Sequence, residues 1–127
     1  MILGVGVDII DVERIQSALA HPRTGERFRA RVFTDEEVAY CTRRRNAAES
    51  FAARFAAKEA MMKAFGRAYG WREIEVLRGS GAPTLRLHGR AQQRAAAAGI
   101  RRIHLSLSHT ATLAIAYVIA EGDAAAG

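Results

Sequence analysis

A single carboxylate lies within an apolar run at the start of the chain. Asp8 follows "GVGV" in the segment MILGVGVDII. A charge taken out of water is costly unless it meets a cation, a metal ion or solvent, so Asp8 is a candidate ligand. In the simpler alternative, Asp8 lies at a strand end and either faces water or caps the next helix. The pattern alone supports both interpretations, ligand and strand end. The preceding glycines do not form a dinucleotide-binding fingerprint, because Ile9 takes the place of its third glycine.

A second carboxylate occurs near the middle of the chain, beside a lysine. Glu59 and Lys63 lie four residues apart in "FAAKEAMMKAFG", the order that favours an ion pair along an exposed helix face. The neighbouring residues are unusually apolar for such a face, which favours a role in binding. Carboxylate oxygens bind hard cations, and an ammonium group binds phosphate. Asp8 and Glu59, completed by water and substrate phosphates, would be a typical Mg²⁺ donor set.

A third group of polar residues lies in "HLSLSHT", near the end of the chain. Neighbouring residues of a strand point to opposite faces, so Ser108 and His109 are poorly placed to act as nucleophile and base. The chain also lacks the Gly-x-Ser-x-Gly motif of many serine hydrolases. Side chains that line a pocket for a polyanion are the better interpretation, although a histidine at a strand end is often an ordinary surface or core residue.

The charge balance points to acidic partners. Nineteen Lys and Arg residues against thirteen Asp and Glu give a net charge of +6. Such a field attracts acidic proteins, phosphate-bearing molecules or nucleic acid. Nucleic-acid binding is disfavoured because the aromatic residues are not interleaved with arginines as a stacking platform. The arginine triplet at residues 43–45 also suits the C-terminal end of a helix, where the dipole favours cations.

These candidates must be positioned by the elements that the pattern predicts. The length of 127 residues favours a single domain, and we place it at residues 1–120. Its mixture of predicted helices and strands is of the α+β class. Asp11 is a candidate cap for the first helix, Thr34 with Glu37 and Asn46 with Glu49 have the spacing of helix caps, and Gly66 is a helix stop. We expect strands at 2–10, 72–79, 84–89, 103–109 and 112–120, helices at 12–20, 34–42, 47–66 and 90–98, and a disordered tail at 121–127.

The cellular setting follows from what the composition allows. The single cysteine, Cys41, excludes an intramolecular disulfide. No apolar run approaches the ~20 residues that a membrane-spanning helix requires, and no basic leader precedes an apolar stretch. We therefore expect a soluble cytoplasmic protein without a membrane partner.

Three blocks taken together carry a family resemblance. "GVGVDIIDVERI", "FAARFAAKEAMMKAFG" and "LSLSHT", in this order and spacing, resemble the holo-[acyl-carrier-protein] synthase family of 4′-phosphopantetheinyl transferases. "FTDEEVAYC" and "GAPTLRLHG" are similar too, so that the resemblance covers nearly all of residues 2–120. It implies a mostly antiparallel sheet packed against a long central helix. It also implies transfer of phosphopantetheine from coenzyme A to a serine of an acidic apo acyl carrier protein, releasing adenosine 3′,5′-bisphosphate.

The resemblance also implies roles for individual residues. Asp8 and Glu59 would bind Mg²⁺ and, with Lys63 on the pyrophosphate, form the catalytic group. Arg14 would dock the carrier protein, and the enzyme would be a homotrimer with its sites between subunits. Arg67 and Ala68 depart from the family pattern, so the resemblance does not define the wall of the pantetheine cleft. The implied coenzyme A-binding residues are Arg44, Arg45, Arg54, Lys63, Gly66, Pro83, Ser108 and His109.

Overall fold

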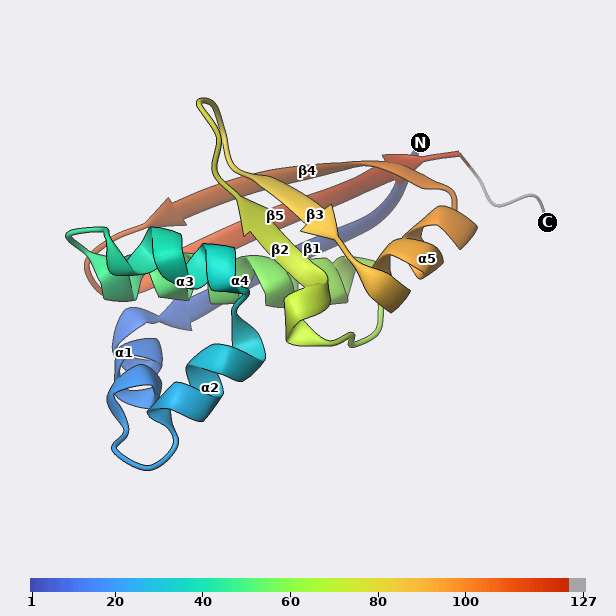
Figure 1. The fold of residues 1–127 in the computed structure, drawn as a ribbon. Helices are drawn as coiled ribbons and strands as arrows, with labels where there is room; N and C mark the ends of the chain where they lie inside the picture. Colours follow the sequence, from blue (N-terminus) through green and yellow to red (C-terminus); the bar gives the residue numbers. More distant parts are fainter. Residues whose placement is uncertain (124–127) are drawn as a thin grey trace.

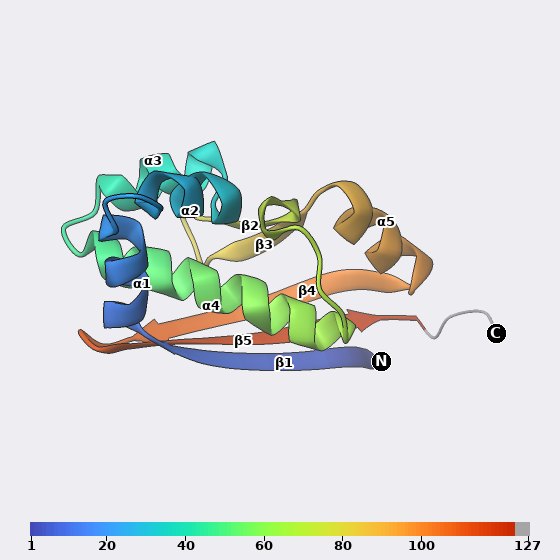
Figure 2. The same cartoon turned by 90° about the horizontal axis from the view of Figure 1, so that it is seen from below.

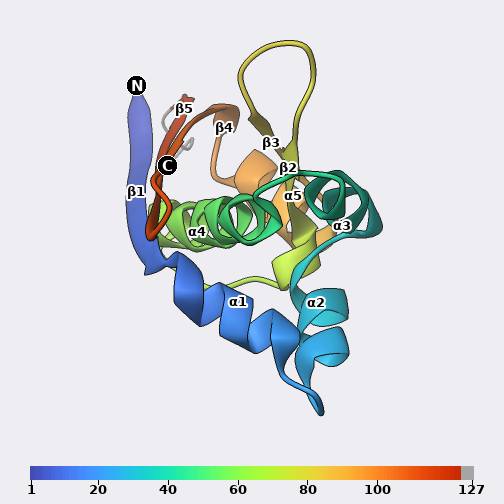
Figure 3. The same cartoon turned by 90° about the vertical axis from the view of Figure 1, so that its left-hand side faces the viewer.

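A long helix crosses one face of a three-stranded antiparallel sheet in the computed structural model, which describes residues 1–123 (Figures 1 and 2). The strand order β1–β5–β4 places the first strand and the fourth at opposite edges, with the last strand between them (Figure 3). These elements are α4 (Ala47–Phe65), β1 (Ile2–Asp11), β4 (Ile100–His109) and β5 (Leu113–Gly122). The predicted α+β class with an antiparallel sheet against a central helix is confirmed.

The remaining elements cover the other side of α4. A hairpin of two short strands lies beside α4, and the helices flank it at both ends (Figures 1 and 3). These elements are α1 (Val12–Ala20), α2 (Gly25–Val32), α3 (Asp35–Thr42), the 3₁₀ helix η1 (Trp71–Glu73), β2 (Ile74–Leu77), β3 (Thr84–Leu87) and α5 (Gly89–Ala97).

Some boundaries differ from the prediction. Helix α2 occupies a segment for which the pattern predicts no element. The strand expected at 72–79 begins later, because residues 71–73 form the 3₁₀ helix. Strand β5 continues to Gly122, where it pairs with Ile100, so residues 121 and 122 belong to the sheet and not to the expected tail. Residues 124–127 of that tail lie outside the described residues.

Two glycines let β1 approach the backbone of α4. A Cβ atom on Gly6 would lie 1.8 Å from the carbonyl oxygen of Ala60, and one on Gly4 would lie 2.2 Å from that of Ala64. No side chain fits at such distances, so glycine at both positions is a packing requirement. The same strand face carries Asp8, which is thereby held against the helix that carries Glu59.

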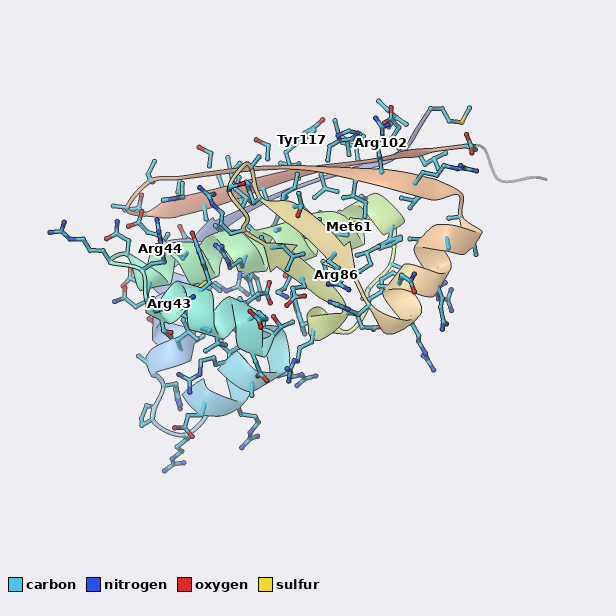
Figure 4. All side chains as sticks on the ribbon, turned by 45° about the horizontal axis from the view of Figure 1, so that its top comes forward. Arg43, Arg44, Met61, Arg86, Arg102 and Tyr117 are labelled. Atoms are coloured by element: carbon cyan, nitrogen blue, oxygen red, sulfur yellow. The ribbon has the colours of Figure 1, made fainter. Side chains whose placement is uncertain are left out.

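The opposite face of the sheet is apolar and exposed. Six residues of β1 and β5 on this face are 39% to 57% exposed: Val5, Val7, Ile9, Leu113, Ile115 and Tyr117. Tyr117 projects away from α4, as does Arg102 on β4 (Figure 4). We call these six residues the outer apolar face.

A buried ion pair connects α4 to α3 and β2. Lys58 Nζ donates to Glu37 Oε1 at 2.7 Å, and both side chains are fully buried. The ammonium also donates to the carbonyl oxygens of Trp71, at 3.0 Å, and Ile74. Burial lowers the pKa of Lys58, and the Glu37 carboxylate opposes that shift. The backbone N–H of Val76 donates to the second oxygen of Glu37, so one carboxylate joins three elements.

The helix caps are confirmed in part. Thr34 and Glu37 form the predicted capping box at the start of α3. Asp11 and Asn46 do occupy the positions before α1 and α4. Neither side chain makes a capping hydrogen bond within the described residues, so the capping role expected for each is wrong. Glu49 bonds to the C-terminal end of β4 instead of closing a cap.

Candidate active site

Asp8 and Lys63 form an ion pair between β1 and α4. Lys63 Nζ donates to Asp8 Oδ1 at 3.1 Å and to the carbonyl oxygen of Val7 at 3.0 Å. The expected alternative, an ion pair along the helix between Glu59 and Lys63, is therefore replaced by a pair across the two elements. Asp8 is nearly buried, whereas more than half of the Lys63 side chain is exposed. The ammonium group is thus open to an approaching anion.

Glu59 lies beside Asp8, one turn of α4 before Lys63. Burial raises the pKa of the Glu59 carboxyl, and the neighbouring Asp8 carboxylate raises it further. Lys63 and Arg14 partly oppose this shift. A carboxyl group whose ionisation is opposed by a neighbouring carboxylate is stabilised in its charged form by a further cation.

The donor set suits a magnesium ion. Within residues 1–123 the structure has no group of three or more His, Cys, Asp and Glu side chains that could hold a metal ion. Asp8 and Glu59 therefore supply two carboxylates at most. Mg²⁺ is commonly bound by one or two carboxylates together with water and substrate phosphates, so these two residues fit it.

A cavity opens beside this pair at the C-terminal end of α4. It has a volume of about 440 Å³, and Glu59, Lys63 and Gly66 lie in its wall. Gly66 has a φ of 77° and ends the helix, as predicted, in the left-handed conformation that glycine adopts readily. Arg67 and Ala68 line the same cavity, where their departure from the family pattern was expected to matter.

A second cavity gathers four of the residues implied to bind coenzyme A. Arg44, Arg54, Pro83 and His109 line a space of about 160 Å³ where α3, α4, the β2–β3 hairpin and β4 meet. Arg44 lies at the end of α3, next to the start of α4 (Figure 4). The other lining residues are Tyr40, Ser50, Ala53, Arg78 and Leu107.

Two further implied residues lie apart from this cavity. Arg45 is exposed in the turn between α3 and α4 and does not line it. Ser108 is exposed and pairs with Ile115 of the outer apolar face. Both residues are therefore accessible to a neighbouring molecule.

Sequence reasoning missed three residues at the second cavity: Glu49, Tyr40 and Arg78. His109 Nδ1 bonds to Glu49 Oε1 at 2.9 Å, which fixes the imidazole ring. Tyr40 and Arg78 reach the cavity from α3 and from the end of β2. The spacing of Asn46 and Glu49 indicated only a cap, and neither Tyr40 nor Arg78 belongs to a motif with its own chemistry. Only tertiary contacts bring these three residues to the cavity, so no pattern along the sequence identifies them.

The two cavities lie on opposite sides of the molecule. Arg54 and Lys63 are nine residues apart on α4, which is two and a half turns, so they point in opposite directions. Asp8 lies on the edge strand β1, and His109 lies on the edge strand β4. One chain therefore presents the carboxylate pair at one edge of its sheet and the arginine cavity at the other.

Arg14 lies close to the carboxylate pair. It is exposed on α1 and lines a cavity of about 700 Å³ that includes Asp11, Ser17 and Thr112. Its positive charge contributes to the pKa of Glu59, which places it near the candidate metal site. An acidic surface that bound Arg14 would therefore lie next to Asp8 and Glu59.

No helix in the part of the chain that the structure describes is both long enough and apolar enough to cross a membrane.

Known proteins are similar to this chain over nearly its whole length. The sequence model of the 4′-phosphopantetheinyl transferase superfamily matches residues 4–118. The holo-[acyl-carrier-protein] synthase of Anaeromyxobacter sp. (strain K) is 52% identical over 125 residues, which cover 96% of this chain and 98% of that protein. The one from Koribacter versatilis is 49% identical, with coverages of 95% and 99%.

Solved structures are similar over the same length. The holo-[acyl-carrier-protein] synthase of Neisseria meningitidis has a TM-score of 0.84 at 30% identity, covering 95% of this chain and 99% of that chain. The holo-(acyl-carrier-protein) synthase of Bacillus anthracis, solved in complex with CoA (3′,5′-ADP), has a TM-score of 0.77 at 32% identity, with coverages of 97% and 99%.

Proposed function

Because this chain belongs to the 4′-phosphopantetheinyl transferase superfamily and matches its holo-[acyl-carrier-protein] synthases over nearly its whole length, we propose that it transfers 4′-phosphopantetheine from coenzyme A to a serine of apo acyl carrier protein. The second product is adenosine 3′,5′-bisphosphate. The observation that carries this proposal is the pair Asp8 and Glu59, with the ammonium of Lys63 beside them at the mouth of an open cavity.

The reaction requires charge neutralisation and alignment more than a nucleophile of the enzyme. The serine oxygen of the carrier protein attacks the phosphorus next to pantetheine, and the bond from that phosphorus to the bridging oxygen breaks. Adenosine 3′,5′-bisphosphate leaves with the bonding electron pair, and the serine proton passes to a base. Glu59 is a carboxylate at this position, and in its ionised form it can accept that proton. Lys63 neutralises charge on the pyrophosphate oxygens.

Magnesium is the cofactor that the donor set supports. Asp8 and Glu59 would hold the ion, which supplies neutralisation of the pyrophosphate charge when bound. We expect Asp8→Asn and Glu59→Gln each to abolish transfer and to weaken Mn²⁺ binding, measured by electron paramagnetic resonance with Mn²⁺ in place of Mg²⁺. Asp35→Asn is the control, since the Asp35 carboxylate is fully exposed and lines neither the Arg14 cavity nor the cavity at Lys63. Full activity of either variant at limiting Mg²⁺ would overturn the assignment.

The carrier protein is proposed to dock at Arg14. The chain has a net charge of +6, and complementary charge accelerates encounter with an acidic partner. Arg14→Glu should strongly weaken carrier-protein binding, measured by calorimetry, while the affinity for coenzyme A is retained. Arg101→Glu makes the same change of charge at the start of β4 and is the control. An equal loss of both affinities in Arg14→Glu would refute the docking role.

We propose that three subunits form a ring with their sites between them. The outer apolar face supports this, because a contiguous exposed apolar patch on a sheet is typical of an interface. The opposite placement of the two cavities supports it as well, since one ligand can reach both only if adjacent chains meet head to tail. Such contacts close into a ring when the rotation allows it. We also propose a cytoplasmic location, with which the single buried thiol is compatible.

A subunit-complementation assay tests the shared site. Asp8→Asn and His109→Ala variants, each inactive alone, should regain activity when they are refolded together, because mixed rings contain sites with Asp8 from one chain and His109 from the other. A mixture of Asp8→Asn with Glu59→Gln is the control and should stay inactive, since these two residues come from one chain. Light scattering should give the mass of three chains. A monomer, or no gain in the first mixture, would contradict the proposal.

A further inference from the structure

Arg54 is a buried cation without an anionic partner. Its residue is only 5% exposed, in the middle of α4. Its Nη1 group donates to the carbonyl oxygen of Ser50 at 3.3 Å, whereas among residues 1–123 no atom accepts a hydrogen bond from its Nε and no carboxylate lies within ion-pair distance. A buried charge is costly unless something compensates it, and Arg54 lines the second cavity. Its position calls for an anionic ligand there.

The ring of Tyr40 lies against this guanidinium group. The Arg54 Cζ atom is 4.3 Å from the centroid of the Tyr40 ring, and the Cζ atom of Arg44 is 5.3 Å from the same centroid. Both distances are within the range of a cation–π interaction. Tyr40 is half-buried on α3, Arg44 follows that helix, and Arg54 belongs to α4. One aromatic ring thus fixes two cations that come from different elements.

Both cations face the same space. Tyr40, Arg44 and Arg54 line the cavity of about 160 Å³, and Arg78 faces it from the hairpin. Like charges repel, so arginines that are free to move would separate in the absence of an anion. The contact with the Tyr40 ring opposes that separation and holds Arg44 and Arg54 in place before the ligand arrives.

We propose that Tyr40 is a positioning residue that orders Arg44 and Arg54 to receive the 3′-phosphate of coenzyme A. This inference rests on the proposed function, which supplies the substrate. Lys63 takes the pyrophosphate at the first cavity, so the 3′-phosphate is the anionic group of coenzyme A that remains for the second cavity. Tyr40 acts through the two arginines and does not touch the reacting phosphorus. Its effect is therefore on the recognition of coenzyme A over an analogue without that phosphate.

The test compares coenzyme A with 3′-dephospho-coenzyme A as donor for three proteins: the wild type, Tyr40→Phe and Tyr40→Leu. Tyr40→Leu removes the ring, and we expect its KM for coenzyme A to rise about 5- to 30-fold with kcat nearly unchanged. Its KM for the dephosphorylated donor should stay within about twofold of the wild-type value. Tyr40→Phe keeps the ring and should behave as the wild type with both donors.

The outcomes separate this inference from the proposals on which it rests. An inactive wild-type protein would refute the proposed function. A wild type that does not distinguish the two donors would refute the role of the arginines as ligands. Discrimination that survives in Tyr40→Leu, or an equal loss with both donors, would overturn the role of Tyr40 alone. Tyr40→Met, whose unbranched side chain adapts more readily to the space, provides the same comparison if Tyr40→Leu does not give the wild-type circular dichroism spectrum.

Discussion

Replacing Lys58 with methionine should destabilise the protein by about 3–5 kcal/mol. Methionine fills most of the space of the lysine stem, so the cost comes from charge rather than from a cavity. The substitution leaves the Glu37 carboxylate fully buried without its cation. It also removes the donor from the carbonyl oxygens of Trp71 and Ile74. Glu37 keeps two backbone donors, from Thr34 and Val76, so its carboxylate is not left wholly unsatisfied.

Urea unfolding followed by circular dichroism, at one fixed protein concentration, measures this loss. Arg72→Met is the control, since both members of its ion pair with Asp35 are exposed and the pair should contribute no more than about 1 kcal/mol. The double variant Glu37→Gln/Lys58→Met should recover part of the loss, because no unpaired charge then remains buried. A Lys58→Met protein within about 1 kcal/mol of the wild type would refute this reasoning.

Three further predictions concern Glu75, Cys41 and Gly6. Burial opposes ionisation of Glu75, but hydrogen bonds from Thr34 and His88 prevail and lower its pKa below 4.5. Stability from such a group is present at neutral pH and lost as the pH falls through the folded-state pKa, so Glu75→Gln should melt below the wild type at about pH 7, and the gap should narrow as the pH falls below 4.5 through that lowered pKa. A gap that persists at low pH would contradict this. Burial raises the pKa of Cys41 to about 11, so iodoacetamide should label this thiol only after unfolding, and rapid labelling of the native protein would be evidence against it. Gly6→Ala should cost about 2 kcal/mol or more in urea and weaken Mn²⁺ binding, since its Cβ would lie 1.8 Å from a carbonyl oxygen of α4, whereas Gly79→Ala, with open space around it, should change neither. Equal effects of the two alanines would exclude the steric explanation.

Local rules in the sequence predicted much of the fold. Alternation along residues 2–10 puts Asp8 on one face with Gly4 and Gly6, and the structure identifies the backbone of α4 as the group that approaches this face. The capping box of Thr34 and Glu37 and the stop at Gly66 also depend only on near neighbours, and both are confirmed.

Contacts between distant segments limited the rest. Helix α2 has few apolar residues, and Phe28 anchors it by packing against Phe33 and Phe55. No local sequence pattern predicts such a contact. The pairing of Lys58 with Glu37 joins residues 21 positions apart, so the capping role of Glu37 was predictable and its ion pair was not.

The candidate site shows the same division. Local spacing predicted that Glu59 and Lys63 share a side of the helix. It also predicted an ion pair between these two residues, and that pair does not form. The approach of β1 brings Asp8 to Lys63 instead. The split of the implied coenzyme A ligands between two cavities depends on the order of the strands, which spacing along the chain does not encode.

The most direct test of the central claim is mass spectrometry of an apo acyl carrier protein after incubation with this protein, coenzyme A and Mg²⁺. The account predicts a gain of one phosphopantetheine group on the carrier protein, and no gain when Asp8→Asn replaces the wild type. A carrier protein that stays unmodified, under conditions in which another holo-[acyl-carrier-protein] synthase modifies it, would contradict the account.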